Sequence, residues 1–126
     1  MTSRSVGKFE AVSTRPGMRS RSLVGPEHGV TSLFVVELLM ENGSEIPLHT
    51  HPIEEVFVVA EGELTLRLVG ETFVAKPDSV VRIPAGTPHA VVNAAPRPAR
   101  ALAAAAWDRS TYFREATEYL EGQPRD

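Results

Sequence analysis

The chain is divided into short apolar segments separated by turn residues at close, regular spacing. Segments rich in β-branched and aromatic residues, or alternating with a period of two, indicate strands, and clusters of Gly, Pro, Asn, Asp and Ser indicate turns. The predicted strands cover residues 30–40, 55–60, 64–68, 72–75, 80–83, 89–93 and 100–107. No helical pattern separates these segments, and parallel strands would need such crossovers. The sequence therefore predicts an all-β fold, a sandwich or barrel of antiparallel strands.

The two ends of the chain differ from this central region. Residues 1–22 carry four arginines and one lysine, and we expect them to form a partly flexible basic arm with one or two edge strands. Residues 100–107 are rich in alanine, so this strand segment is ambiguous with helix. An apolar stripe at helical spacing predicts a short helix over residues 108–121. The expected organisation is an arm, a barrel over residues 23–107, and a C-terminal helix and tail over residues 108–126.

Composition limits the classes of protein to which the chain can belong. Its 126 residues suit one domain with one hydrophobic core. It has no cysteine, which excludes disulfides, thiolate metal sites and cysteine nucleophiles. A net charge of −3 argues against a general nucleic-acid surface, and no apolar run has the length of a membrane span. We therefore expect a cytoplasmic protein with no nucleic-acid and no membrane partner.

Four side chains between residues 49 and 89 have the chemistry of a metal site. His49 and His51 lie two residues apart, so on a strand they share one face. Pro52 and Ile53 then interrupt the strand, and a carboxylate can re-enter the same cavity at Glu55. His89 follows a Pro- and Gly-rich loop. Three neutral imidazoles and one carboxylate form a mixed nitrogen and oxygen site that suits one divalent iron, manganese, nickel, copper or zinc ion.

The same residues carry a close resemblance to the cupin superfamily. The first cupin motif is matched at every element, by Gly43, His49, His51, Glu55 and Gly62. The second motif is matched by Pro84, Gly86, His89 and Asn93. Its opening glycine is replaced by Asp78, and aspartate is among the few residues that tolerate the positive φ such a turn requires. We therefore expect the turn to survive this substitution.

The resemblance implies a fold, a ligand set and an assembly. The motifs are spaced as in the small single-domain bacterial cupins, which implies a jelly-roll β-barrel with a central metal and a tendency to form homodimers. The implied ligands are His49, His51, Glu55 and His89. Glu54 competes with Glu55 for the carboxylate role, but the spacing to Gly62 favours Glu55. Four protein ligands leave open positions on an ion that accepts five or six.

The residues around the predicted ligands suggest a pocket for a small organic substrate. Phe57 and Val59 share a strand face with Glu55, and Val91 and Asn93 share one with His89, so these four are the candidate pocket residues. For the apolar ones, core packing is an equally good interpretation. Arg82 can face the cavity or the outer surface, and the outer surface is the more frequent position for arginine.

Among metal-dependent functions, the nearest resemblance is to the small quercetinase-like cupins, which implies a dioxygenase that uses Fe(II). The same four ligands also suit a lyase, isomerase or decarboxylase in which the metal polarises a carbonyl or carboxylate. A third interpretation is a cupin that binds a small molecule without turnover. The motifs alone do not choose among these three.

Overall fold

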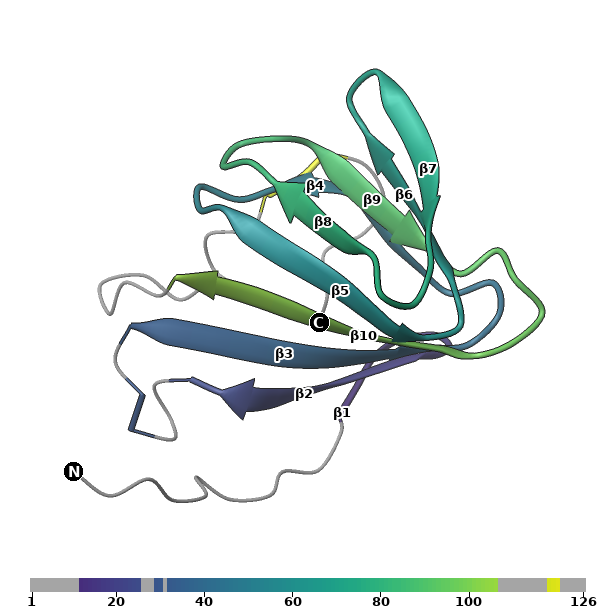
Figure 1. Cartoon of the computed structure of the whole chain (residues 1–126), viewed down its shortest axis with the longest axis horizontal. Helices are drawn as coiled ribbons and strands as arrows, with labels where there is room; N and C mark the ends of the chain where they lie inside the picture. The colour runs from purple at the N-terminus through teal and green to yellow at the C-terminus, as the bar shows by residue number, and fades with distance from the viewer. Residues whose placement is uncertain (1–11, 26–28, 31, 107–117, 121–126) are drawn as a thin grey trace.

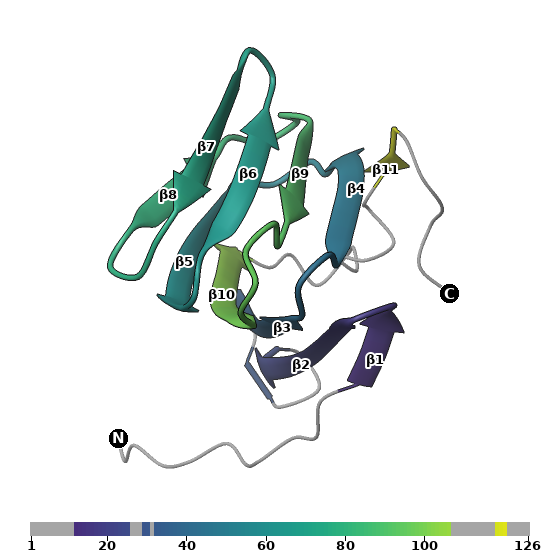
Figure 2. The ribbon, with the colours of Figure 1, turned by 90° about the vertical axis from the view of Figure 1, so that its right-hand side faces the viewer.

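The computed structural model describes residues 12–25, 29–30, 32–106 and 118–120, which contain strands and no helix. The strands are β1 (Val12–Arg15), β2 (Met18–Val24), β3 (Leu33–Met40), β4 (Glu45–Thr50), β5 (Glu55–Glu61), β6 (Leu64–Leu68), β7 (Glu71–Ala75), β8 (Val80–Ile83), β9 (His89–Val92), β10 (Ala99–Ala106) and β11 (Glu118–Tyr119). They form two sheets that face each other (Figures 1 and 2), in the orders β1-β2-β3-β10-β5-β8 and β11-β4-β9-β6-β7. None of the described segments is a helix long and apolar enough to cross a membrane.

Eight of the strands pair like one long hairpin that has been rolled up. β3 pairs with β10, β4 with β9, β5 with β8 and β6 with β7, and every pair is antiparallel. The additional pairs β10–β5 and β9–β6 join these four strand pairs into the two sheets. This nesting is the jelly-roll arrangement. The prediction of an all-β antiparallel jelly-roll barrel is therefore confirmed.

The alanine-rich segment that was ambiguous with helix is β10, and it lies in the middle of the larger sheet. Its backbone pairs with β3 on one side and with β5 on the other. Every second side chain is buried, from Ala99 to Ala105, which is the period of a strand. Two neighbouring strands therefore satisfy both edges of its backbone, and this overrides the helical preference of alanine.

The core lies between the two sheets and is formed by the inward-facing side chains of both. These side chains are almost fully buried, and the largest apolar ones are Met40, Phe57, Val59, Leu64, Leu66, Ile83 and Val91. The strands predicted from the sequence agree with the observed ones to within three residues at each end. Alternation and turn residues were thus sufficient to locate seven of the strands that enclose this core, whereas β4 was not among the strands predicted with bounds.

The ends of the chain differ in detail from the sequence prediction. The basic arm contains two strands, β1 at the edge of the larger sheet and β2 between β1 and β3, and the boundary placed after residue 22 falls inside β2. Residues 108–117 of the predicted C-terminal helix lie outside the described part of the chain. At Glu118–Tyr119 the helix prediction is wrong, because these residues form β11 and pair with Thr50 and His49 of β4. The edge of β4 that β9 leaves free offers backbone hydrogen-bond partners to these residues, and the helical pattern of the sequence did not reveal this.

Asp78 adopts the backbone conformation that the second motif normally assigns to glycine. Its φ is 72°, and it is the one non-glycine residue with positive φ among those described. Ser79 donates its N–H to the carbonyl of Lys76 at 3.0 Å, which closes a turn with Pro77 and Asp78 at the centre. A positive φ at the residue directly after the proline, the third residue of the turn, is typical of a type II turn. The prediction that the turn survives is confirmed.

Gly62 closes the first motif at a point where two chain segments touch. Its φ is 72°, and a Cβ added there would lie 2.5 Å from the carbonyl oxygen of Pro98 and 3.0 Å from Cα of Ala99. Gly70 has a similar φ of 82°, but a Cβ there would meet nothing within 4 Å. Gly62 is therefore required by both conformation and space, whereas Gly70 is required by conformation alone.

We expect Gly62→Ala to lower the free energy of unfolding by about 2–4 kcal/mol, because a positive φ and an overlap with backbone both have to be relieved. The control Gly70→Ala should cost only about 1 kcal/mol, since it introduces the unfavourable φ without the overlap. Urea denaturation of the two variants measures the difference. Equal losses would show that the approach of Pro98 to Gly62 is not a tight contact.

For Asp78, replacement by alanine should lower the free energy of unfolding by about 1 kcal/mol, because alanine tolerates a positive φ less well. Replacement by glycine should change it by less than about 0.5 kcal/mol, since relief of the backbone is offset by a more flexible unfolded chain. Thermal or urea unfolding checks both values. A glycine variant as unstable as the alanine variant would mean that the aspartate side chain, rather than the turn conformation, matters.

Candidate metal centre

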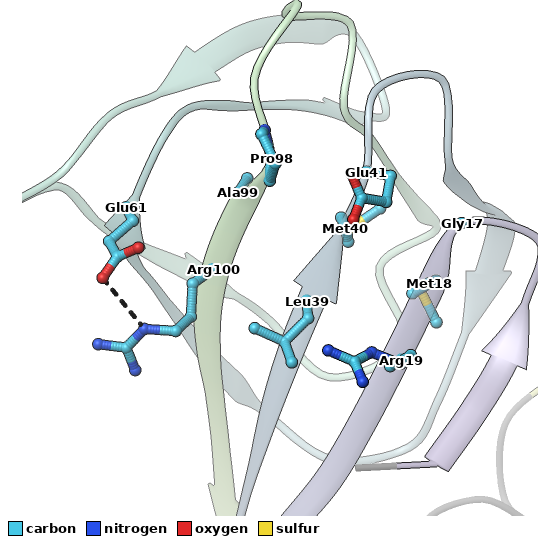
Figure 3. Close-up of a pocket in the computed structure, with 10 residues that line it drawn as sticks. All are labelled: Gly17, Met18, Arg19, Leu39, Met40, Glu41, Glu61, Pro98, Ala99 and Arg100. Carbon is cyan, nitrogen blue, oxygen red and sulfur yellow. Dashed lines mark ion pairs between the residues drawn. The ribbon is translucent and has the colours of Figure 1, made fainter.

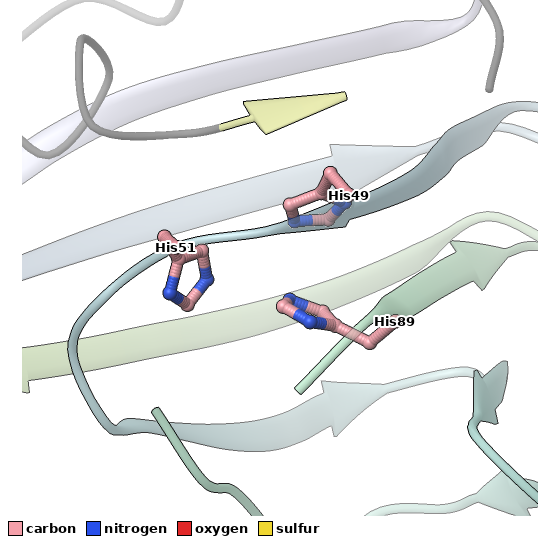
Figure 4. A group of neighbouring side chains, drawn as sticks. All are labelled: His49, His51 and His89. Atoms are coloured by element: carbon pink, nitrogen blue, oxygen red, sulfur yellow. The ribbon is translucent and has the colours of Figure 1, made fainter. Parts of the chain in front are cut away.

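The nested pairing of the strands brings the predicted ligands to one end of the barrel. His49 is near the end of β4, His51 follows it directly, Glu55 begins β5 and His89 begins β9. The antiparallel register of β4 and β9 places His49 opposite His89, although they are far apart in sequence. The three imidazole rings converge on one another inside the barrel (Figure 4).

The donor atoms are spaced as the ligands of one ion would be. One ring nitrogen from each of His49, His51 and His89 lies within 4.8 Å of the other two. Oε1 of Glu55 lies 3.7 Å from Nε2 of His89 and 3.8 Å from Nε2 of His51, too far for direct hydrogen bonds. Two donors that each lie about 2.1 Å from an ion are about 3 Å apart at right angles and about 4.2 Å apart when opposite. The three histidines therefore fit a single metal ion with little adjustment, whereas Glu55 lies beside His51 and His89 but outside this group and would have to move closer to share the ion.

The second nitrogen of each ring is fixed by the backbone. Nδ1 of His49 lies 2.8 Å from the carbonyl oxygen of Pro47, Nδ1 of His51 lies 3.1 Å from that of Ile53, and Nδ1 of His89 lies 2.8 Å from that of Thr87. A carbonyl only accepts, so each Nδ1 must carry a proton, and Nε2 is the nitrogen left to bind an ion. Backbone groups that orient ligating histidines in this way are the rule in metal sites. The backbone therefore fixes the orientation of all three rings.

Burial and mutual proximity set the charge of the cluster. Burial, followed by repulsion from the neighbouring His89, lowers the pKa of His49 to about 4. Burial alone would raise the pKa of Glu55, but its attraction to His51 and His89 outweighs this and lowers the pKa to about 2. At neutral pH the site therefore has a neutral His49 ring and an ionised carboxylate, which is the protonation state that a metal ion requires.

His89 provides a separate indication that the cluster is built for a ligand. Its side chain is 2% exposed, and its Nε2 is buried without a hydrogen-bond partner among the described residues. Buried polar atoms are nearly always satisfied, so such an atom calls for an explanation. A cation bound by Nε2 would satisfy it.

The structure distinguishes Glu55 from its neighbour Glu54. The Glu55 side chain is 9% exposed and faces the histidines. The Glu54 side chain is 54% exposed and pairs with Arg82, whose side chain is 65% exposed. Glu54 and Arg82 thus lie on the outer surface, as the sequence suggested for both.

Three of the four predicted pocket residues face the barrel interior. Phe57 and Val91 lie one step further along their strands than Glu55 and His89, and both are buried in the hydrophobic core. Val59 is also buried, but it is four residues from Glu55, about 13 Å along an extended strand. The alternation of side chains along a strand therefore predicted that these three residues face the interior. It did not show that Val59 lies too far along β5 to be close to the histidines.

Asn93, the fourth predicted pocket residue, has a structural role instead. Its side-chain amide donates to the carbonyl oxygens of Met40 and Arg97, both at 2.8 Å, and its Oδ1 accepts from the N–H of Ala95 at 3.0 Å. Its side chain therefore holds loops together at the end of β9 away from His89. The prediction that Asn93 lines the pocket did not anticipate that nearby backbone groups use both ends of its amide.

The walls next to Glu55 come from residues that sequence reasoning did not single out. In register with Glu55 are Ile83 on β8 and Ala105 on β10, and Ala105 is in turn paired with Phe34 on β3. All three side chains are apolar and buried. Only the cross-strand register identifies them, because a period of two shows which face a residue occupies but not which residues lie beside it.

A groove of about 430 Å³ lies at the other end of the larger sheet (Figure 3). Met40 and Ala99, which pair with each other, line it together with Arg19 and Arg100. Glu55 pairs with Ala105 at the opposite end of β10. This groove is therefore separate from the histidine cluster and does not provide access to it.

Comparison with known proteins agrees with the architecture of the chain and its site. A family model described as the cupin domain matches residues 35–105, which include the three histidines and Glu55. The polyketide synthase CurC from Streptomyces cyaneus is 40% identical over 73 residues, 57% of this chain and 47% of CurC. The chain thus spans about half the length of CurC, and the same holds for another curated relative that it matches.

Two solved structures have the same fold. The polyketide cyclase RemF from Streptomyces resistomycificus superposes with a TM-score of 0.77 at 22% identity, covering 98% of this chain and 87% of RemF. The DMSP lyase DddQ from Ruegeria pomeroyi superposes with a TM-score of 0.72 at 26% identity, covering 94% of this chain and 64% of DddQ. With the family model spanning more than half of its residues, the chain belongs to the cupin domain family.

Proposed function

We propose that this protein is a metal-dependent enzyme that acts on a small organic molecule. One observation carries the proposal: three buried histidines each bring one ring nitrogen within 4.8 Å of the other two, and each ring is fixed by a backbone carbonyl at its Nδ1. His49, His51 and His89 would hold one divalent ion together with Glu55. Such a donor set suits Fe(II), Mn, Ni, Cu or Zn.

The protein's own residues would orient the ligands and keep water away. The carbonyls of Pro47, Ile53 and Thr87 prevent the rings from rotating. The Glu55 carboxylate supplies the negative charge that partly neutralises a divalent cation. A bound ion would act as a Lewis acid that polarises a carbonyl or carboxylate of the substrate.

The surroundings of the site favour a substrate with an apolar body and oxygen donors. Phe34, Ile83 and Ala105 line the side of Glu55, and Phe57 lies one step deeper. No lysine or arginine is buried among the described residues, and Arg82 faces outward, so no positive charge inside this part of the barrel would pair an anion. A molecule with neighbouring carbonyl groups would present oxygen atoms to the ion and its carbon skeleton to these walls.

Within this class we favour a reaction that does not consume dioxygen, such as ring closure or elimination next to a carbonyl. Two relatives support this choice by what they are called: CurC is a polyketide synthase and DddQ is a DMSP lyase. Polyketide-type substrates carry the alternating carbonyl groups that the walls and the donor set would accept. The dioxygenase suggested by the sequence is the second candidate, and the suitability of this donor set for Fe(II) supports it.

The metal site makes a direct prediction. Wild-type protein should bind about one divalent ion per chain, and Glu55→Ala should weaken binding at least tenfold, about 1.4 kcal/mol, because one of four ligands is lost. Glu54→Ala is the matched control and should bind within twofold of wild type, since Glu54 is paired with Arg82 on the surface. Competition with a chromophoric chelator measures all three affinities. The reverse order of the two variants would refute the assignment of Glu55.

The reaction class is tested by supplying short linear poly-β-ketones and 1,3-diketones to Zn(II)- or Mn(II)-loaded protein without oxygen. We expect cyclised products that have lost water, detected by mass spectrometry, because carbonyl polarisation needs no redox change at the metal. Fe(II)-loaded protein in air is the comparison. Oxygen uptake with incorporation of both oxygen atoms would replace the proposal with the dioxygenase, and tight binding without turnover would identify a small-molecule-binding cupin.

A further inference from the structure

The C-terminal strand β11 lies along the part of β4 that carries His49 (Figure 4). Tyr119 pairs with His49 and Glu118 pairs with Thr50. The N–H of Leu120 donates to the carbonyl oxygen of Leu48 at 2.8 Å. A segment far from the cupin motifs in sequence thus contacts the backbone of a predicted metal ligand.

This contact occurs where β4 is poorly held on its other side. β4 pairs with β9, but the register shifts between Ile46 and His49. Pro47 lies in this interval and has no N–H to donate. His49 is also the residue whose ring depends on the carbonyl of Pro47. The position of the His49 ring therefore depends on a stretch of backbone whose ladder with β9 is interrupted.

β11 supplies the missing support. Without it β4 would be the edge of the five-stranded sheet, because β11 is its only neighbour on that side in the described structure. A strand of two residues makes few backbone hydrogen bonds, so its docking is weak enough to respond to changes at β4. We propose that β11 is a positioning strand for the metal site, and that its docking and metal binding favour each other.

This inference rests on the proposed metal site and adds a coupling to it. If β11 holds His49 in the arrangement that binds an ion, then the ion must stabilise the docked state of β11 by the same factor. β11 would therefore be docked for a larger fraction of the time in the metal-loaded protein than in the metal-free protein. No residue of β11 needs to contact the ion for this to hold.

The backbone bond of Leu120 allows a clean test, because its side chain is 46% exposed. Leu120→Pro removes the N–H that binds Leu48, whereas Leu120→Ala keeps it and controls for loss of the side chain. We expect the proline variant to bind Zn(II) five- to twentyfold more weakly than wild type, and the alanine variant to bind within twofold. In wild type, Zn(II) should slow amide hydrogen exchange at residues 48–50 and at residue 120.

The outcomes separate this coupling from the metal site itself. If wild type binds Zn(II) and Leu120→Pro binds it equally well, the coupling is wrong while the metal site stands. If Zn(II) binds without any change in exchange at residues 48–50, the coupling is likewise overturned. If wild type binds no Zn(II), the proposed metal site fails and the coupling fails with it. A proline variant with an unchanged urea midpoint but weakened Zn(II) binding supports positioning over general destabilisation.

Discussion

The antiparallel register of β4 and β9 is the interaction on which the rest of the site depends. It places His49 directly opposite His89, and the turn after β4 then returns the chain so that His51 and Glu55 face the same interior. A shift of one residue in this register would turn His89 to the other face of the sheet. The loop before β9 is fixed to the same end of the barrel, because Gly86 donates its N–H to the carbonyl of His51 at 2.9 Å and so ties the loop that carries Thr87 to the first histidine pair.

The two cupin motifs divide their residues between the two ends of the barrel. The histidines and Glu55 are at one end, where donor atoms converge. Gly43 and Asn93 are at the other, where the N–H of Gly43 donates to the carbonyl of Asn93 and the N–H of Asn93 donates to that of Ser44. Gly62 belongs to this second group because its neighbours are the backbone atoms of Pro98 and Ala99. A motif that spans both ends therefore specifies the scaffold and the site together. Some of the residues that match it support the fold, so a match does not by itself identify site residues.

Most of the fold and the residues that meet at the candidate site could be predicted from the sequence, because both follow from local patterns. Alternation, turn residues and the spacing of His49, His51 and Glu55 are visible within short windows. Asp78 is a similar case, since its tolerance of a positive φ is a property of the residue itself. Asn93 and β11 could not be assigned in this way. Their roles depend on backbone groups of distant segments, which carry no side-chain signature, and in β11 an open strand edge outweighed a helical pattern.

The electrostatics of the histidine cluster explain why the surrounding fold has to hold these side chains close together. Lone pairs that point at one buried place repel one another, and burial of ring nitrogens and a carboxylate is unfavourable unless they are paired. Burial lowers the pKa of His49 to about 4, so protonation of this ring does not relieve the repulsion at neutral pH. The strand pairing and the Nδ1 hydrogen bonds of all three rings hold the donors together despite this cost. A local arrangement that the rest of the fold must maintain is expected at a functional site, and a divalent cation is the ligand that would convert this repulsion into attraction.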